Sequence, residues 1–179
     1  NLLRFTSDFI SFDGLPANII SEPQSALKRA IREVTEAANI DLSEGQSTRA
    51  PFEYDKKPVS NEDFSYWGAI GFLLIWPINL FLALNNKTKL AARAFSISAV
   101  IFLISQSFSG PYDPWRGRYF LICAPFALTA LGLWINAITN ERRRGSLIYL
   151  VAISAITCFS ALHATFYKDP VPPQILSQV

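Results

Sequence analysis

The second half of the chain is dominated by four long apolar runs. They cover residues 66–84, 90–108, 119–138 and 147–166, and the only permanently charged side chain inside them is Arg93. A bilayer core about 30 Å thick needs about 20 apolar residues of helix, because the backbone must be hydrogen-bonded within the segment. The pattern therefore predicts four transmembrane helices. Four buried helices of a soluble protein are disfavoured, because such helices are shorter and little other sequence remains to cover them.

Two of the four runs contain a proline, Pro77 in the first and Pro125 in the third. Proline has no backbone N–H and leaves a carbonyl of the preceding turn without its usual partner. Membrane helices tolerate this where neighbouring side chains satisfy the freed carbonyl. We therefore expect a kink in each of these two helices.

The first 64 residues follow an amphipathic pattern instead. Apolar residues recur at helical spacing in the first stretch, at Leu2, Phe5, Phe9 and Phe12. Arg4 and Asp8 lie on another face of this helix, which is expected to end at the turn signal Asp13–Pro16.

A second helix is expected from about Glu22 to Asn39, with Ser21 and Gln24 as a capping box. Its apolar stripe is formed by Leu27, Ile31, Val34 and Ala38. The two helices can form a cap that packs on itself, or they can lie on the outer leaflet and wall a lipid access path. The pattern favours the interfacial placement for the first helix and leaves the second open.

These patterns predict an all-α fold: a polytopic helical membrane protein whose four transmembrane helices are preceded by an extracytoplasmic helical arm. The expected organisation is an extracytoplasmic or interfacial arm and loop over residues 1–64, a four-helix transmembrane region over 65–167 and an outer tail over 168–179.

Charge divides the chain at the same place. Residues 1–64 carry 7 basic and 11 acidic side chains, whereas residues 65–179 carry 9 basic and 3 acidic ones. In an alternating bundle the loop after the first run and the loop after the third lie on one side, and they hold most of the basic residues: Lys87, Lys89, Arg93, Arg142, Arg143 and Arg144. The positive-inside rule assigns that side to the cytoplasm, so the arm faces outward from the inner membrane.

Several aromatic residues fall at the outer boundary, where an interfacial belt is expected: Tyr66, Trp67, Tyr112, Trp115, Tyr119 and Tyr167. Arg116 and Arg118 also lie on this side, where the orientation of the helices does not require positive charge.

Composition excludes several classes of protein. Two cysteines cannot form a disulfide framework, and a single histidine without a cysteine cluster leaves no structural zinc site. Basic residues occur in small groups between apolar runs, which excludes a nucleic-acid partner. The chain starts at Asn1, contains no methionine and shows no signal peptide, so we interpret it as a processed piece or a fragment of a longer protein.

Two adjacent acids, Glu62 and Asp63, directly precede the first apolar run. Neighbouring carboxylates can hold a divalent cation, or one can act as a base toward a hydroxyl acceptor. Acids at this position are also common at a solvated helix N-terminus, where the helix dipole favours them. The sequence alone favours the second explanation.

The outer loop from Ser109 to Tyr119 is rich in glycine, proline and aromatic residues and contains Arg116 and Arg118. A guanidinium group stays ionised and matches a phosphate bidentately, so the pair can bind a lipid phosphate or diphosphate at the membrane surface. Snorkelling toward headgroups would explain Arg118 but not the preceding Tyr-Asp-Pro-Trp turn. Both interpretations stay open.

Three stretches together resemble a known group of enzymes. PYDPWRGRYFLICAPFAL resembles the late loop of bacterial GT-C-type membrane glycosyltransferases, related to the dolichyl-phosphate-mannose protein mannosyltransferases, in which a PW-x-x-RY/RL-x-L-x-x-P pattern recurs. EDFSYWGAIGFLLIWP resembles the start of an earlier span of the same group, and LLRFTSDFISFDGLP resembles the preceding extracytoplasmic helix. The resemblance covers residues 1–15 and 60–140.

The resemblance implies that the chain is the C-terminal membrane portion of an enzyme that transfers a sugar, with inversion, from a polyprenyl-phosphate carrier to an extracytoplasmic acceptor. The catalytic acid of such enzymes lies in the first extracytoplasmic loop, so this chain would need the N-terminal transmembrane region that it lacks.

The resemblance also implies roles for individual residues. Arg116 and Arg118 would bind the carrier phosphate, and the residues that shape their loop would be Asp113, Trp115 and Tyr119. Glu62 and Asp63 would lie near a divalent cation or near the acceptor.

Two other classes stay open. One is a non-enzymatic multi-pass subunit of a transporter or scaffold, and the other is a different enzyme of envelope polymer assembly that uses polyprenyl-linked sugars. Ionisable side chains inside a membrane normally mark a transport path. Of the His, Lys, Arg, Asp and Glu residues, only His163 and Arg93 lie in the four runs, which disfavours an ion or proton carrier.

Overall fold

The computed structural model describes residues 1–10, 12, 15–43, 48–49, 52, 67–140 and 144–166, without the side chains of residues 17, 114–118 and 164. The helices of this part of the chain are α1 (Leu2–Phe9), α2 (Ala17–Ala37), α3 (Gly68–Ile70), a π-helical turn (Gly71–Ile75), α4 (Trp76–Leu84), α5 (Leu90–Phe108), a 3₁₀ helix (Pro114–Cys123), α6 (Ala124–Asn140) and α7 (Arg144–Phe166). The described ranges contain no sheet, and their β-structure is limited to an isolated bridge between Thr48 and Tyr112. The expected all-α fold is confirmed for these residues.

Three helices in the described part of the chain are long and apolar enough to cross a membrane, judged by length and composition. They are Leu90–Phe108, Tyr119–Asn140 and Arg144–His163. The run predicted over 66–84 forms a shorter apolar helix, Gly68–Leu84. At a rise of 1.5 Å per residue this helix is about 25 Å long, somewhat less than the bilayer core of about 30 Å. The described part of the chain therefore supports a membrane protein with three candidate spans and one shorter apolar helix.

The short helix is irregular where Pro77 was expected to perturb it. The π-helical turn Gly71–Ile75 precedes α4, and Pro77 lies in the first turn of α4. Because Pro77 has no N–H, the carbonyl of Leu73 loses its α-helical partner, and the hydroxyl of Tyr149 on α7 donates a hydrogen bond to it. A side chain from a neighbouring helix thus satisfies the freed carbonyl, as membrane helices require.

Small residues let the central helices approach closely. Ala99 on α5 and Ala127 and Ala130 on α6 are fully buried, and close contact between backbones is the usual basis of helix packing in membranes. Asn79 on α4 is also fully buried, and its side-chain amide donates to the carbonyls of Ile75 (2.8 Å) and Ala127 (3.2 Å). This amide links α4 to α6.

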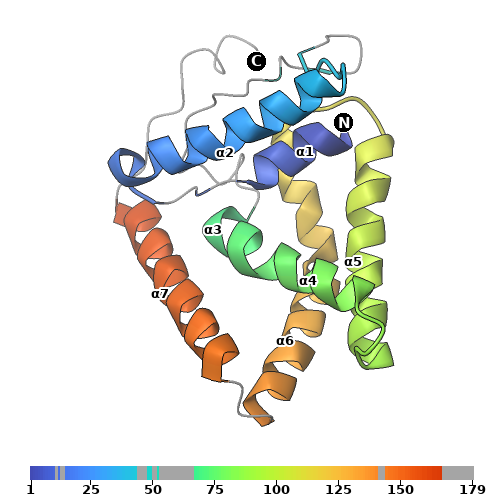
Figure 1. The fold of residues 1–179 in the computed structure, drawn as a ribbon, viewed down its shortest axis with the longest axis vertical. Coiled ribbons are helices and arrows are strands. Elements are labelled where there is room, and N and C mark those ends of the chain that lie inside the picture. Colours follow the sequence, from blue (N-terminus) through green and yellow to red (C-terminus); the bar gives the residue numbers. More distant parts are fainter. Residues whose placement is uncertain are drawn as a thin grey trace.

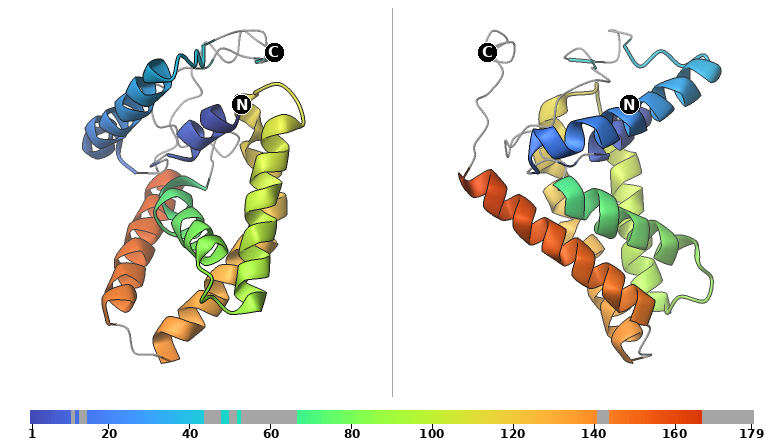
Figure 2. Two further views of the ribbon diagram at one scale, coloured as in Figure 1. Left: turned by 45° about the vertical axis from the view of Figure 1, so that its right-hand side comes forward. Right: turned by 60° about the vertical axis from the view of Figure 1, so that its left-hand side comes forward.

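The two arm helices lie across one end of the bundle, the end at which α5 stops and α6 begins (Figures 1 and 2). Helix α1 lies between α2 and the bundle, and its Phe5 and Phe9 are buried. They join an aromatic cluster that we call the arm cluster: Phe5, Phe9, Leu42, Phe52, Trp76, Tyr112, Phe120 and Cys123. The sequence pattern favoured a placement of this apolar face against lipid, whereas in the structure it contacts protein.

Helix α2 differs from its prediction in two ways. It begins at Ala17 rather than Glu22, and Ser21 and Gln24 lie inside it, so the expected capping box is wrong. The Gln24 side chain accepts a hydrogen bond from the backbone N–H of Phe12 instead, at 3.3 Å.

The buried face of α2 is also not the predicted apolar stripe. Val34 is 69% exposed, and the buried positions are Ile20, Gln24, Lys28 and Thr35. The helix is thus turned so that a largely polar face, next to the apolar stripe, is covered.

Candidate functional site

The two arginines predicted to bind phosphate lie in the 3₁₀ helix that leads into α6. We call residues 114–118, which contain Trp115, Arg116 and Arg118, the arginine segment; the structure describes its backbone. Asp113 precedes it and is partly exposed, and Tyr119 follows it and is 46% exposed. Glu62 and Asp63 lie outside the described residues.

Tyr112 fixes the chain just before the arginine segment. Its side chain is 2% exposed, and its hydroxyl donates a hydrogen bond of 2.7 Å to Oδ2 of Asp8 on α1. Its carbonyl accepts a hydrogen bond of 2.8 Å from the backbone N–H of Arg49. Tyr112 was expected in an interfacial belt, and that expectation is wrong, because its ring and hydroxyl both contact protein.

Phe120 fixes the chain just after the arginine segment. Its ring is fully buried and lies edge-on to Phe9, with 4.9 Å between centroids. Phe5 contacts both flanks of the segment, at 5.4 Å from the Tyr112 ring and 5.5 Å from the Phe120 ring. One side chain of α1 therefore bridges the residues on either side of the arginine segment.

Arg4 is a buried cation on α1, with 3% of its surface exposed. Its Nε donates to the carbonyl of Leu42 at 2.7 Å, and one terminal nitrogen donates to Oδ1 of Asn1 at 2.9 Å. The guanidinium carbon lies 5.9 Å from the centroid of the Tyr112 ring, which is within cation–π range. The Asn1 side chain also donates to the carbonyl of Gly110 at 2.9 Å, so the N-terminus of α1 holds the start of the loop Ser109–Tyr119 as well.

The beginning of the short helix forms a second unusual region. Trp67 and Gly68 both adopt a left-handed backbone conformation, with φ of 68° and 52°, which is rare for a bulky residue such as tryptophan. The rings of Trp67 and Trp76 stack at 5.3 Å, and Phe9 lies edge-on to both. Both indole N–H groups are buried, and neither has an acceptor in the described part of the chain.

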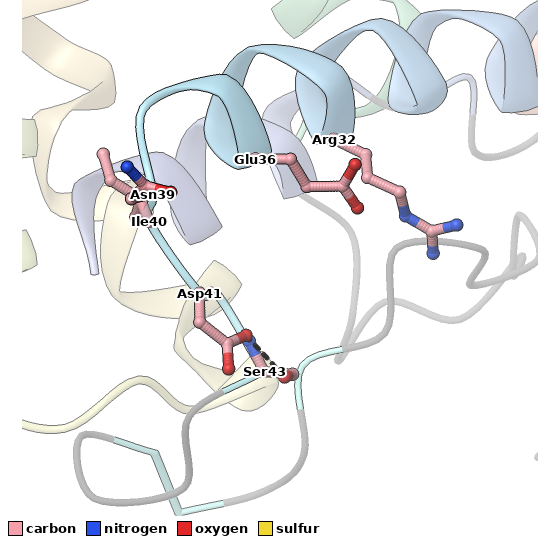
Figure 3. A pocket seen from close by; sticks show the side chains of 6 residues that line it. All are labelled: Arg32, Glu36, Asn39, Ile40, Asp41 and Ser43. Atoms are coloured by element: carbon pink, nitrogen blue, oxygen red, sulfur yellow. Dashed lines mark hydrogen bonds between the residues drawn. The ribbon is translucent and has the colours of Figure 1, made fainter.

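A polar hollow of about 590 Å³ lies at the C-terminal end of α2 (Figure 3). Its lining residues are Arg32, Glu36, Asn39, Ile40, Asp41 and Ser43, and none of them was a candidate from the sequence. The Ser43 hydroxyl and backbone N–H both donate to Oδ1 of Asp41, at 2.5 and 2.8 Å. These hydrogen bonds, the hydroxyl's first, lower the pKa of the Asp41 carboxyl below its ordinary value.

No group of three or more metal-ligating His, Cys, Asp or Glu side chains occurs among the residues that the structure describes. The carboxylates for which a cation role was considered, Glu62 and Asp63, lie outside those residues.

Sequence reasoning missed the residues that hold the arginine segment. Arg4 and Asp8 were recognised only as a polar face, although their i,i+4 spacing puts them side by side on α1. Tyr112 was recognised as part of the loop motif, and nothing in the sequence pairs it with Asp8, which lies 104 residues earlier.

Comparison with known proteins gives no further assignment: no family model, curated protein or solved structure matches the chain. The geometry of the arginine segment and its supports is therefore the basis for a functional assignment.

Proposed function

We propose that this chain is the membrane portion of a glycosyltransferase that moves a sugar from a polyprenyl-phosphate carrier to an acceptor outside the cytoplasm. The observation that carries the proposal is the position of the arginine segment. It lies at the start of a candidate membrane span, between two buried aromatic anchors, Tyr112 and Phe120. Two cations are thereby attached to a fixed stretch of backbone at the end of an apolar helix.

The surroundings of the arginine segment suit an amphiphile. Leu121 and Ile122, which follow it, are each 60% exposed, and Tyr119 is 46% exposed. A polyprenyl phosphate has an apolar tail and a charged head, so it can lie along such a surface with its phosphate near Arg116 and Arg118. Guanidinium groups bind phosphate bidentately and would stabilise the negative charge that develops on the departing carrier phosphate.

We further propose that the helix Gly68–Leu84 is a fourth span and that the arm faces outward from the inner membrane. Lys87 and Lys89 lie in the turn between α4 and α5, and Arg144 is the first residue of α7. This turn and the start of α7 lie at the opposite end of the bundle from α1 (Figure 1). The positive-inside rule assigns that end to the cytoplasm. Arg93 supports the same turn, since its Nε donates to the carbonyl of Ala83 at 3.2 Å.

In this proposal the chain supplies donor binding, and the catalytic acid comes from another part of the full protein. A divalent cation, if one is used, would assist in neutralising the carrier phosphate. Glu62 and Asp63 remain the candidates in this chain for holding a cation or for contacting the acceptor.

A second candidate is a non-enzymatic membrane subunit that packs on partner helices. It is favoured by α7, whose apolar side chains are widely exposed: Ile148, Val151, Phe159, Leu162 and Phe166 are each more than half exposed. Surrounding lipid would cover these side chains equally well, so the two candidates must be separated by their chemistry.

The separating experiment is binding and transfer of a polyprenyl-phosphate sugar by the full-length protein in detergent, with and without a divalent cation. Arg118→Ala should reduce transfer by about tenfold or more, the cost of a lost charge-assisted hydrogen bond. Lys87→Ala removes a cation from the opposite end of the bundle and should leave transfer unchanged. Equal losses in the two variants, or no binding of the donor by the unaltered protein, would favour the non-enzymatic subunit.

A further inference from the structure

We infer that the arm helix α1 acts as a positioning element for phosphate binding, with Asp8 and Tyr112 as the positioning residues. The inference rests on the proposed function, because it explains how the backbone of Arg116 and Arg118 is held in place for a lipid phosphate.

The apolar part of the support comes from Phe5. This fully buried side chain contacts Tyr112, two residues before the arginine segment, and Phe120, two residues after it. The segment is only five residues long, so its backbone cannot shift far while both flanks stay in the arm cluster. Apolar packing is non-directional, however, and does not by itself fix the orientation of the Tyr112 ring.

The directional part of the support is the buried hydrogen bond from the Tyr112 hydroxyl to Asp8, at 2.7 Å. A hydrogen bond to a carboxylate is roughly twice as strong as one between neutral groups. It sets the orientation of the Tyr112 side chain, and the carbonyl of the same residue is fixed by the N–H of Arg49. The loop is therefore held from α1 on one side and from residue 49 on the other.

Phosphate binding should depend on this support even though Asp8 and Tyr112 need not touch the phosphate. A segment that is held in place before binding does not lose conformational entropy when the ligand arrives, whereas a loosened segment does. Loss of the Tyr112–Asp8 bond should therefore weaken the contribution of the phosphate to binding and leave the contribution of the apolar tail unchanged.

The test measures two dissociation constants for the full-length protein in detergent, one for a polyprenyl phosphate and one for the polyprenol of the same length. We divide the dissociation constant of the polyprenol by that of the polyprenyl phosphate and call this ratio the phosphate increment. Tyr112→Phe should lower the phosphate increment by about threefold or more, since it removes one hydrogen bond to a charged acceptor. A general loss of structure would weaken the binding of both ligands and leave the phosphate increment unchanged.

Tyr149→Phe is the matched control, because it removes a phenolic hydroxyl that also crosslinks two helices, through the carbonyl of Leu73. It should destabilise the protein without lowering the phosphate increment. Asp8→Ala should act like Tyr112→Phe, whereas Asp8→Asn keeps an acceptor for the tyrosine hydroxyl and should restore most of the increment. If Tyr112→Phe does not fold, the comparison of Asp8→Ala with Asp8→Asn tests the inference.

The possible results separate the inference from the proposed function. If Tyr112→Phe and Asp8→Ala keep the full increment while Arg118→Ala loses it, α1 is not a positioning element and the phosphate site stands. If Tyr149→Phe lowers the increment as much as Tyr112→Phe, the increment does not depend specifically on the support from α1 and the inference is wrong. If the unaltered protein shows no phosphate increment, the proposed function itself fails.

Discussion

Phe5→Ala is the substitution that should most strongly loosen the outer loop. Phe5 is fully buried and contacts the rings of Tyr112 and Phe120 at 5.4 and 5.5 Å. Truncation of a buried phenylalanine to alanine costs about 3–5 kcal/mol. The two aromatic pairs account for about 0.5–1.5 kcal/mol each, and burial and the resulting cavity account for the remainder. Since α1 is only eight residues long and depends on this packing, the loss should appear as local opening of the arm cluster.

Cys123 provides a direct reporter of that opening, because its thiol lies in the arm cluster and is fully buried. Each 1.4 kcal/mol is a factor of ten in an opening equilibrium, so a loss of about 3–5 kcal/mol should speed alkylation of Cys123 by about 100-fold or more. Mass spectrometry separates this modification from that of Cys158 on α7, whose rate should be the same in both proteins and serves as the internal reference.

The matched control is Phe108→Ala, which truncates a phenylalanine at the C-terminal end of α5 that is 78% exposed. It should leave alkylation of Cys123 unchanged. An unchanged rate in Phe5→Ala would refute the assignment of Phe5 as the bridge between the two flanks. A rise in both variants would show that the cluster responds to general destabilisation.

Two further predictions concern regions away from the arginine segment. Asn79→Leu should destabilise the protein by about 0.5–1.5 kcal/mol per lost hydrogen bond, because it removes the amide that donates to the carbonyls of Ile75 and Ala127. Reversible unfolding in detergent measures this, and an unchanged stability would contradict the role of Asn79 as the link between α4 and α6. Ser43→Ala should raise the pKa of the Asp41 carboxyl toward its ordinary value, because it removes the hydroxyl that lowers it. The stabilisation linked to this carboxylate is present above its unfolded-state pKa and is lost as the pH falls through the lower folded-state pKa. Carboxyl NMR titration measures the shift, and a lowered pKa in the variant would contradict the hydrogen-bond assignment.

The long apolar helices were predictable because length and hydrophobicity are local properties of the sequence. Residues 90–108 form a helix with the predicted bounds, and α7 ends at Phe166 as expected. Pro77 was expected to kink its helix, and the structure has a π-helical turn, Gly71–Ile75, directly before α4. The sequence reasoning also expected a neighbouring group to satisfy the freed carbonyl. The identity of that group, the hydroxyl of Tyr149, depends on how α7 packs and could not be read from the pattern.

The arm was less predictable, because its contacts are with residues far away in the sequence. Aromatic residues at a membrane boundary usually form an interfacial belt, so Tyr112 was assigned to one, and only its contact with α1 shows that it is buried. Arg4 and Asp8 have the spacing of an exposed ion pair, yet both are buried. In α2, Pro16 precedes the first helical residue, Ala17, and the helix continues through Pro23, so this proline lies inside the helix and not in its first turn.

The central claim is that Arg116 and Arg118 bind the phosphate of a lipid carrier at the outer end of α6. It is tested most directly by the phosphate increment of the full-length protein and of its Arg116→Ala/Arg118→Ala double variant. The account predicts that the unaltered protein binds the polyprenyl phosphate at least about tenfold more tightly than the polyprenol, and that the double variant binds both equally. Equal binding of the two lipids by the unaltered protein, or an increment that survives in the double variant, would contradict it.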